Sequence, residues 1–181
     1  MRLAIAASLA ILILAARPSA AEGGEGFLSS TAFVVTGGLL IPQGVELDPG
    51  THLGLAALYE TGYGIAVGAE GTLSHSNDPV HIRITSIGLH ARISPEPDYH
   101  TAFLMVGAGV YTVTYHPGLG ETAPEDKVRP GGSFGFGVEF FRWGSVSLGG
   151  SGAYHGLIIN RGDKVAFVAG AATLTWRPRQ F

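Results

Sequence analysis

Side chains that could perform nucleophilic chemistry come together in one short stretch of the chain. Ser74, His75 and Asp78 stand there, and hydrolases combine a serine nucleophile, a histidine base and an acid that orients the base. A serine and the histidine next to it on a loop seldom point at each other, and no group that would stabilise an oxyanion accompanies them. We therefore predict no catalytic residues and a protein that is not an enzyme.

Histidines are the second group of side chains that could bind a metal or transfer a proton. Imidazoles gathered at one end of a molecule could hold a divalent metal or titrate near pH ~6. No segment has a ligand spacing such as His-x-x-x-His, so we predict no metal and no cofactor, and a metal-responsive rim stays as an alternative. The histidines near the longer connections described below are His52, His75, His81, His116 and His155.

The N-terminal segment has the features of a secretory signal peptide. Arg2 provides a positive start, residues 3–16 are an uncharged, apolar run with a single serine, and Ser19 and Ala21 are the small residues that signal peptidase requires. The run is too short to cross a bilayer as a helix, which takes ~17–25 residues. We expect residues 1–21 to be a leader and residues 22–181 to form one domain.

Composition limits both the partners and the means of stabilisation. Without Arg2 and Arg17, the eleven Lys and Arg become nine against fourteen Asp and Glu, a formal charge of −5. Nucleic acid is not an expected partner, because it requires a basic surface. The chain has no cysteine, so neither disulfides nor the modified cysteine of a lipoprotein can hold it. A sheet closed on itself in a bilayer is stable without them, because every backbone group is paired.

The connections between apolar segments alternate in length. The longer ones are residues 42–50, 74–79, 117–131 and 157–163, and the shorter ones are residues 61–63, 94–98 and 142–144. A membrane-spanning barrel has this asymmetry, because its periplasmic turns are short while its extracellular loops are free to grow. Seven connections join eight strands, with both chain ends on the periplasmic side.

Alternation of apolar with small or polar residues marks the strands. We expect a bulge near residues 85–87, where the alternation shifts from Ile82 and Ile84 to Ile87 and Leu89. The predicted strands are residues 27–41, 52–60, 63–73, 81–93, 100–115, 133–141, 145–155 and 164–176.

The few charges within the strands indicate which face is inside. Where the alternation is clean, they share a face with Gly, Ala and Ser, while Leu, Ile, Val and Phe occupy the other face. This is the pattern of a barrel with apolar residues in lipid and a polar interior. We predict that Glu70, Arg83 and Glu139 form an interior charge network that plugs the barrel, and a proton or ion path is the alternative.

Aromatic residues gather near both ends of the predicted strands. We expect them to form two belts at the membrane interfaces, whereas core packing would scatter the rings along the strands. Beside the shorter connections and the C-terminus lie Tyr59, Tyr63, Tyr99, Phe103, Phe140, Phe141, Trp143 and Trp176, and beside the longer connections lie Tyr111, Tyr115, Phe134 and Tyr154.

With this strand pattern, a leader and a terminal Phe181, the chain resembles the small outer-membrane barrels of Gram-negative bacteria, the OmpA/OmpX-like group. The predicted fold class is all-β, an eight-stranded antiparallel up-and-down transmembrane β-barrel. The resemblance implies a monomer in the bacterial outer membrane, in contact with lipid and lipopolysaccharide, and inserted by the barrel-insertion machinery. The interior of an eight-stranded barrel is just wide enough for side chains or one small ligand.

We predict a non-enzymatic outer-membrane barrel with a structural role or a role in surface interactions through its extracellular loops. One alternative is an outer-membrane barrel that passes or holds a small hydrophobic molecule, and another is a soluble periplasmic lipocalin-like barrel with a polar outer face. One loop triplet matches an integrin-binding tripeptide, but its Gly and Asp also serve the turn itself. The candidate contact residues are Glu121, Glu125, Asp126, Lys127, Arg129 and the triplet Arg161, Gly162 and Asp163.

Overall fold

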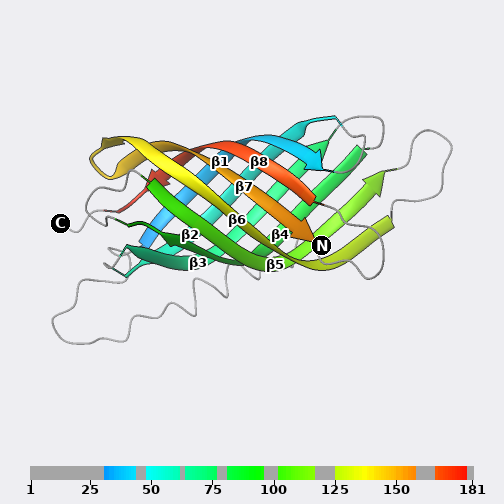
Figure 1. Ribbon diagram of the computed structural model, residues 1–181, viewed down its shortest axis with the longest axis horizontal. Helices are drawn as coiled ribbons and strands as arrows, with labels where there is room; N and C mark the ends of the chain where they lie inside the picture. The colour runs from blue at the N-terminus through cyan, green and yellow to red at the C-terminus, as the bar shows by residue number, and fades with distance from the viewer. Residues whose placement is uncertain are drawn as a thin grey trace.

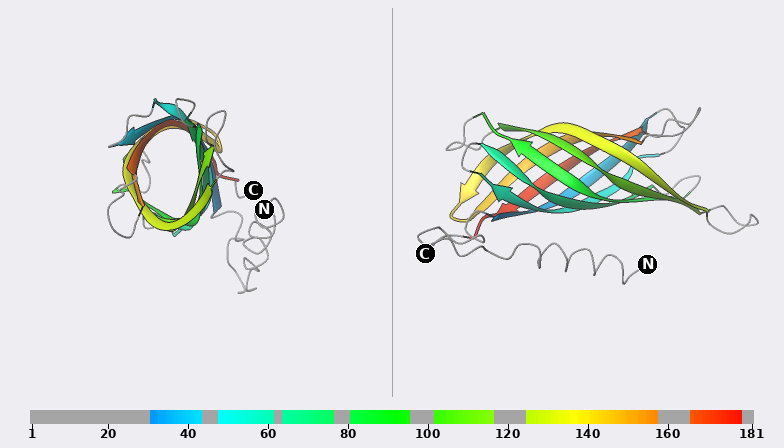
Figure 2. Two further views of the ribbon diagram at one scale, coloured as in Figure 1. Left: turned by 90° about the vertical axis from the view of Figure 1, so that its right-hand side faces the viewer. Right: turned by 90° about the horizontal axis from the view of Figure 1, so that it is seen from below.

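Eight antiparallel strands form a closed barrel in the computed structural model (Figure 1). The strands are β1 (Thr31–Gln43), β2 (Gly50–Glu60), β3 (Ile65–Ser76), β4 (His81–Ile93), β5 (Ala102–His116), β6 (Glu125–Trp143), β7 (Val146–Leu157) and β8 (Ala166–Trp176). Each strand pairs with the next, and β8 closes the ring by pairing with β1, as the end-on view in Figure 2 shows. The predicted all-β, up-and-down barrel of the transmembrane type is confirmed.

The structure describes residues 31–43, 48–61, 64–76, 81–95, 102–116, 125–157 and 166–178. The predicted leader, residues 1–21, lies outside the described residues. Within those ranges there is no helix of the length and apolar character that crossing a membrane requires.

The two ends of the barrel are distinguished by their connections. β1 begins and β8 ends at one end, the terminal end, which also holds the β2–β3, β4–β5 and β6–β7 connections, and we call the other the far end. The contrast in loop length is smaller than predicted, because β6 begins at Glu125, inside the predicted loop 117–131. The connection from β5 to β6 is therefore residues 117–124, and it is no longer than the connection of residues 94–101 at the terminal end.

Alternation along each strand sends large apolar side chains outward. In β2, Leu53 and Leu55 are exposed, Leu55 by 64%, while His52 and Leu58 are buried. The other strands present the same kind of outer face, with exposed Val35, Val67, Ile87, Leu104, Phe136, Leu148 and Leu174. A lipocalin-like barrel would have the reverse arrangement, so this finding overturns that alternative.

β5 shows the limit of the alternation rule. It turns Phe103 and Tyr111 into the barrel and exposes Leu104 and Val106. Phe103 and Tyr111 therefore do not belong to the interface belts in which the sequence analysis placed them. Both faces of β5 are apolar, so its own sequence does not tell inside from outside.

β4 has no bulge, because its register is unbroken against both β3 and β5. Ile84 is buried inside the barrel and Ile87 is exposed outside, so the shift in the sequence pattern reflects apolar residues on both faces. The predicted bulge near residues 85–87 is wrong. A register shift occurs instead in β6, between Glu139 and Phe141.

Most of the predicted belt residues in the described part of the chain are exposed. Near the terminal end these are Tyr59, Phe140, Phe141, Trp143 and Trp176, and on β6 and β7 they are Phe134 and Tyr154. The rings of Phe134 and Tyr154 lie 5.5 Å apart between centroids. Tyr63, Tyr99 and the side chain of Tyr115 lie outside the described residues.

Two apolar clusters pack inside the barrel, in the space we call the lumen. A small one near the terminal end joins Ala32, Val34, Leu58 and Ala66. A larger one near the far end consists of Leu40, Ile84, Tyr111, Val113, Leu157 and Phe167. Polar and charged side chains occupy the lumen between and around these clusters, and they form the candidate site.

Candidate functional site

Four charged side chains meet in the lumen at the terminal end. Glu139 of β6 accepts a hydrogen bond from Arg92 of β4 at 3.0 Å and two from the terminal nitrogens of Arg177, at 3.1 and 3.0 Å. Arg177 follows β8 directly and donates its Nε–H to Glu60 of β2 at 2.7 Å. We call Glu60, Arg92, Glu139 and Arg177 the arginine–glutamate cluster.

Neighbouring groups hold this cluster in place. The guanidinium of Arg92 lies 3.9 Å from the ring centre of Phe103, and Ser147 accepts a hydrogen bond from Arg177 at 3.0 Å. Burial by itself would lower the pKa of Arg177, but its hydrogen bonds to Glu139 and the charges of Glu139 and Glu60 outweigh burial and raise that pKa. Two acids and two bases sum to zero charge, which offsets the cost of removing them from water.

Glu70 forms a separate polar group nearer the middle of the barrel. Its Oε2 pairs with Nδ1 of His90 on β4 at 3.0 Å. Two positions beyond Glu70 on β3, Thr72 pairs with Ser86 of β4, and their hydroxyls share a hydrogen bond of 2.6 Å. β3 and β4 are therefore joined inside the lumen by side chains as well as by their backbones.

Two histidines lie beyond Glu70 toward the far end. His52 shares a hydrogen bond of 2.8 Å with Ser74, and His155 shares one of 3.1 Å with Tyr111. The ring of His155 stacks on Phe167 with centroids 4.5 Å apart, and it lies 5.9 Å from the ring of His52. These two histidines are buried in the lumen and are not at the rim where the sequence analysis placed them.

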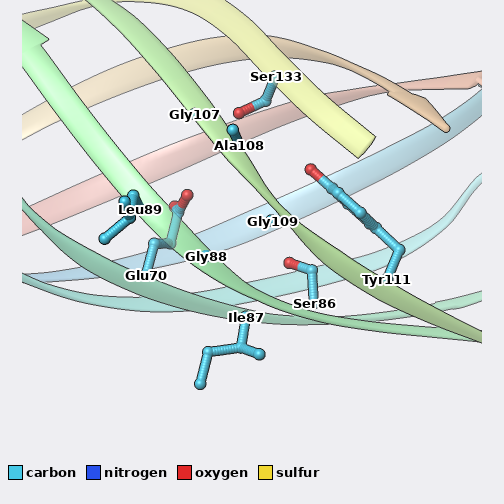
Figure 3. Close-up of a pocket in the computed structure, with 10 residues that line it drawn as sticks. All are labelled: Glu70, Ser86, Ile87, Gly88, Leu89, Gly107, Ala108, Gly109, Tyr111 and Ser133. Carbon is cyan, nitrogen blue, oxygen red and sulfur yellow. The ribbon is translucent and has the colours of Figure 1, made fainter. Parts of the chain in front are cut away.

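A small pocket lies in the lumen beside Glu70 (Figure 3). Glu70, Ser86, Tyr111 and Ser133 line it with polar groups, and the backbones of glycines complete its wall: Gly88, Gly107 and Gly109. A small polar cavity of this kind suits ordered water, which needs several hydrogen-bonding partners. It does not suit a small hydrophobic ligand.

The predicted interior network is only partly present. Glu70 and Glu139 face the lumen but belong to different groups, while Arg83 is exposed on the outer face of β4, so its predicted place in the network is wrong. The sequence does contain a signal for this: Arg83 and Arg92 are an odd number of positions apart and must face opposite sides of a regular strand. Only Arg92 shares the parity of Ser86 and Gly88, which marks the inward face.

The contributions of Arg177 and Glu60 were missed. Arg177 comes after the last strand, where alternation no longer applies, and it meets Glu139 across 38 positions of sequence. No spacing rule connects these residues. Closure of the barrel brings them together.

The predicted contact residues between 121 and 129 do not all lie in a loop, although the sequence predicted that they would. Glu125, Asp126, Lys127 and Arg129 belong to β6, and the side chains of Lys127 and Arg129 are half-buried. The side chains of Glu125 and Asp126 lie outside the described residues. So do Glu121, Arg161, Gly162 and Asp163.

The groups with catalytic or metal-binding potential are arranged in the lumen as structural pairs. Ser74 meets His52, not the adjacent His75, and it is only 1% exposed, so a substrate has no access to its hydroxyl. Among the described residues, no three ligand-type side chains gather where they could hold a metal ion. The side chains of His81 and His116 lie outside that part of the chain.

Comparison with known proteins supports the fold. No family model and no curated protein matches the sequence. The structure is similar to Neisserial surface protein A, with a TM-score of 0.62 and 13% identity over 82% of this chain and 97% of that one. It is also similar to the N-terminal β-barrel domain of Pseudomonas aeruginosa OprF, with a TM-score of 0.52 and 10% identity over 81% and 98%. Ail, the attachment invasion locus protein of Yersinia pestis, gives a TM-score of 0.51 and 12% identity over 81% and 97%.

These neighbours are small outer-membrane barrels, and the chain has their fold, an eight-stranded transmembrane β-barrel. At identities of this order the similarity concerns the fold alone. It extends over nearly the whole length of each neighbour.

Proposed function

We propose that this chain is a non-enzymatic, monomeric barrel of the Gram-negative outer membrane, with the far end on the cell surface. Its role is structural or lies in surface contacts made by the far-end loops. The observation that carries the proposal is the outer face, which is apolar on all eight strands around a lumen in which two acids and two arginines pair with one another. That arrangement is stable in lipid and unfavourable in water.

The fold neighbours support this location, since they are outer-membrane proteins. One of them is named for attachment and invasion, which favours surface contact over a purely structural role. The barrel-insertion machinery, outer-membrane lipid and lipopolysaccharide are the partners that this location implies.

A channel or carrier for a small hydrophobic molecule is the second candidate. The described lumen gives it less support, because the pocket beside Glu70 is polar and the arginine–glutamate cluster lies in the lumen at the terminal end. We infer that the cluster is a plug, since eight-stranded barrels fill their interior with side chains.

Cell fractionation combined with gel mobility tests the proposed location. We expect the chain in the outer-membrane fraction, extracted only by detergent, and we expect the unboiled sample to migrate faster than the boiled one because the folded barrel resists the detergent. A chain that is soluble in the periplasm without detergent would contradict the proposal.

A further inference from the structure

Arg83 is a charged residue on the face of β4 that otherwise meets lipid. Thr85 is the next outward residue of this strand, and Ile87 and Leu89, which follow it on the same face, are exposed and apolar. An arginine that faces lipid destabilises a barrel strongly at the bilayer midplane, but its cost falls close to zero near the interface. The position of Arg83 along the barrel axis therefore decides whether it is a defect or a binding residue.

The strand register gives that position. Arg83 is paired with His75, and ten residues earlier on β3 Ile65 is paired with Ile93 at the terminal end of the apolar face. Ten residues rise about 33 Å along the strand, or about 25 Å along the barrel axis at a tilt of about 40°, which is the height of the apolar band of such barrels. Arg83 and His75 thus lie where the far-end side of the band stops.

Polar residues surround Arg83 on the same outer face. His75 is its partner on β3, Thr51 lies beyond His75 on β2, and Thr114 is its partner on β5. Arg83 and Thr51 are exposed and His75 and Thr114 are half-buried. Among the described side chains, no hydrogen bond or ion pair joins Arg83 to a carboxylate. We call Thr51, His75, Arg83 and Thr114 the outer polar row.

We propose that the outer polar row binds a phosphate group of lipopolysaccharide in the outer leaflet, a proposal that rests on the outer-membrane location. The planar guanidinium can donate two parallel hydrogen bonds to a phosphate, and imidazole and hydroxyl groups can add further donors. The four side chains of the row are exposed or half-buried, so a free phosphate ion would remain hydrated there. A phosphorylated lipid differs, because its acyl chains can also contact the apolar surface below the row, at Leu73 and, beyond Thr85, at Ile87.

The test measures lipid retained by the full-length barrel. The chain is folded into phosphatidylcholine vesicles that contain bisphosphorylated lipid A, extracted gently, and analysed by native mass spectrometry for bound lipid A. We expect Arg83→Gln to retain about fivefold to tenfold less than the unaltered chain, the loss of a charge-assisted contact at an exposed site. Arg83→Lys should retain an intermediate amount, because it keeps the charge and loses the paired geometry.

Arg142→Gln is the matched control. Arg142 is an exposed arginine on β6 beside the terminal-end turn, so its removal changes the net charge equally and should leave retention unchanged. The unaltered chain should also retain little dephosphorylated lipid A or phosphatidylglycerol. Added inorganic phosphate should not displace the lipid.

The outcomes separate this inference from the proposed function. Equal retention by Arg83→Gln and the unaltered chain, equal retention of dephosphorylated lipid A or phosphatidylglycerol, or displacement by inorganic phosphate each overturns the lipopolysaccharide site while leaving the barrel in the membrane. An unaltered chain that fails to insert into vesicles overturns both. If Arg83→Gln does not fold, Arg83→Lys and the dephosphorylated lipid decide the matter.

Discussion

Glu139 is the acid of the arginine–glutamate cluster that pairs with both arginines, and its burial explains why it must stay paired. It is 7% exposed and accepts hydrogen bonds from Arg92 on β4 and from Arg177, which follows β8. Glu60 belongs to the same cluster but has a single partner, Arg177, and a more exposed side chain. Glu139 and Glu60 are both glutamates of the cluster, but more of its ion pairs depend on Glu139.

This difference gives a prediction for two matched substitutions. Glu139→Gln should lower the free energy of unfolding by about 3 kcal/mol, because it leaves two buried guanidinium groups without a full counter-charge. Glu60→Gln should cost about 1 kcal/mol or less, since solvent screens that pair. Urea unfolding of the barrel in lipid vesicles measures both, and equal losses would show that the cluster does not centre on Glu139.

At the level of the strands, inward-facing glycines allow neighbouring backbones to approach each other closely. A Cβ built at Gly68 of β3 would overlap the carbonyl oxygen of Ala57 on the neighbouring β2. Gly152 of β7 is also within a strand, but a Cβ there meets no atom within 4 Å. Both positions lie within strands, but Gly68 faces the lumen and closely approaches β2, whereas Gly152 lies on the outward face with Leu148 and Tyr154 and has open space around it.

We therefore expect Gly68→Ala to separate β2 from β3 and to destabilise the barrel by about 1–3 kcal/mol, as overpacking does. Gly152→Ala should change stability by no more than about 0.5 kcal/mol, as substitutions away from special features do. The fraction of fast-migrating folded band after graded urea treatment measures both variants. If both variants behaved alike, strand propensity, not the β2–β3 approach, would explain the loss.

In the whole molecule, the number of antiparallel strands is even, so the barrel wall begins and ends on the same side of the membrane. β1 begins and β8 ends at the terminal end, together with the turn at residues 144–145. β6 extends beyond β7 at the far end, because its pairing with β7 begins only at Gly131 while its pairing with β5 continues to Glu125. This projecting segment is the described part of the molecule best placed to meet a partner.

The chain contains no cysteine, so an introduced cysteine is its single thiol, and labelling of that thiol reports the orientation of the barrel in the membrane. With a maleimide attached to a polymer too large for outer-membrane pores, Glu125→Cys should react in intact cells. Ser145→Cys, in the turn at the terminal end, should react only after the outer membrane is permeabilised. The reverse pattern would show that the barrel is inverted, and labelling of both in intact cells would show that it does not span the outer membrane.

The class of fold can be predicted from the amino-acid sequence alone. Eight segments with period-two alternation, outward Leu, Ile, Val and Phe, and inward small residues are enough to predict a closed transmembrane barrel, because a strand in lipid must present an apolar face and pair every backbone group. The strand that ends at Trp176 and the inward positions of Glu70 and Glu139 follow from the same alternation.

Only the tertiary structure decided which residues meet in the lumen and which face of an apolar strand is inside. Alternation states that Phe103 and Leu104 face opposite ways, but both are apolar, so the neighbouring strands determine that Phe103 packs inside against Arg92. Arg92, Glu139 and Arg177 come from three distant parts of the chain and are joined by the register of a closed sheet. The pattern within one strand indicates which face is inside, but which distant residues meet across the lumen depends on the pairing of all eight strands around the ring.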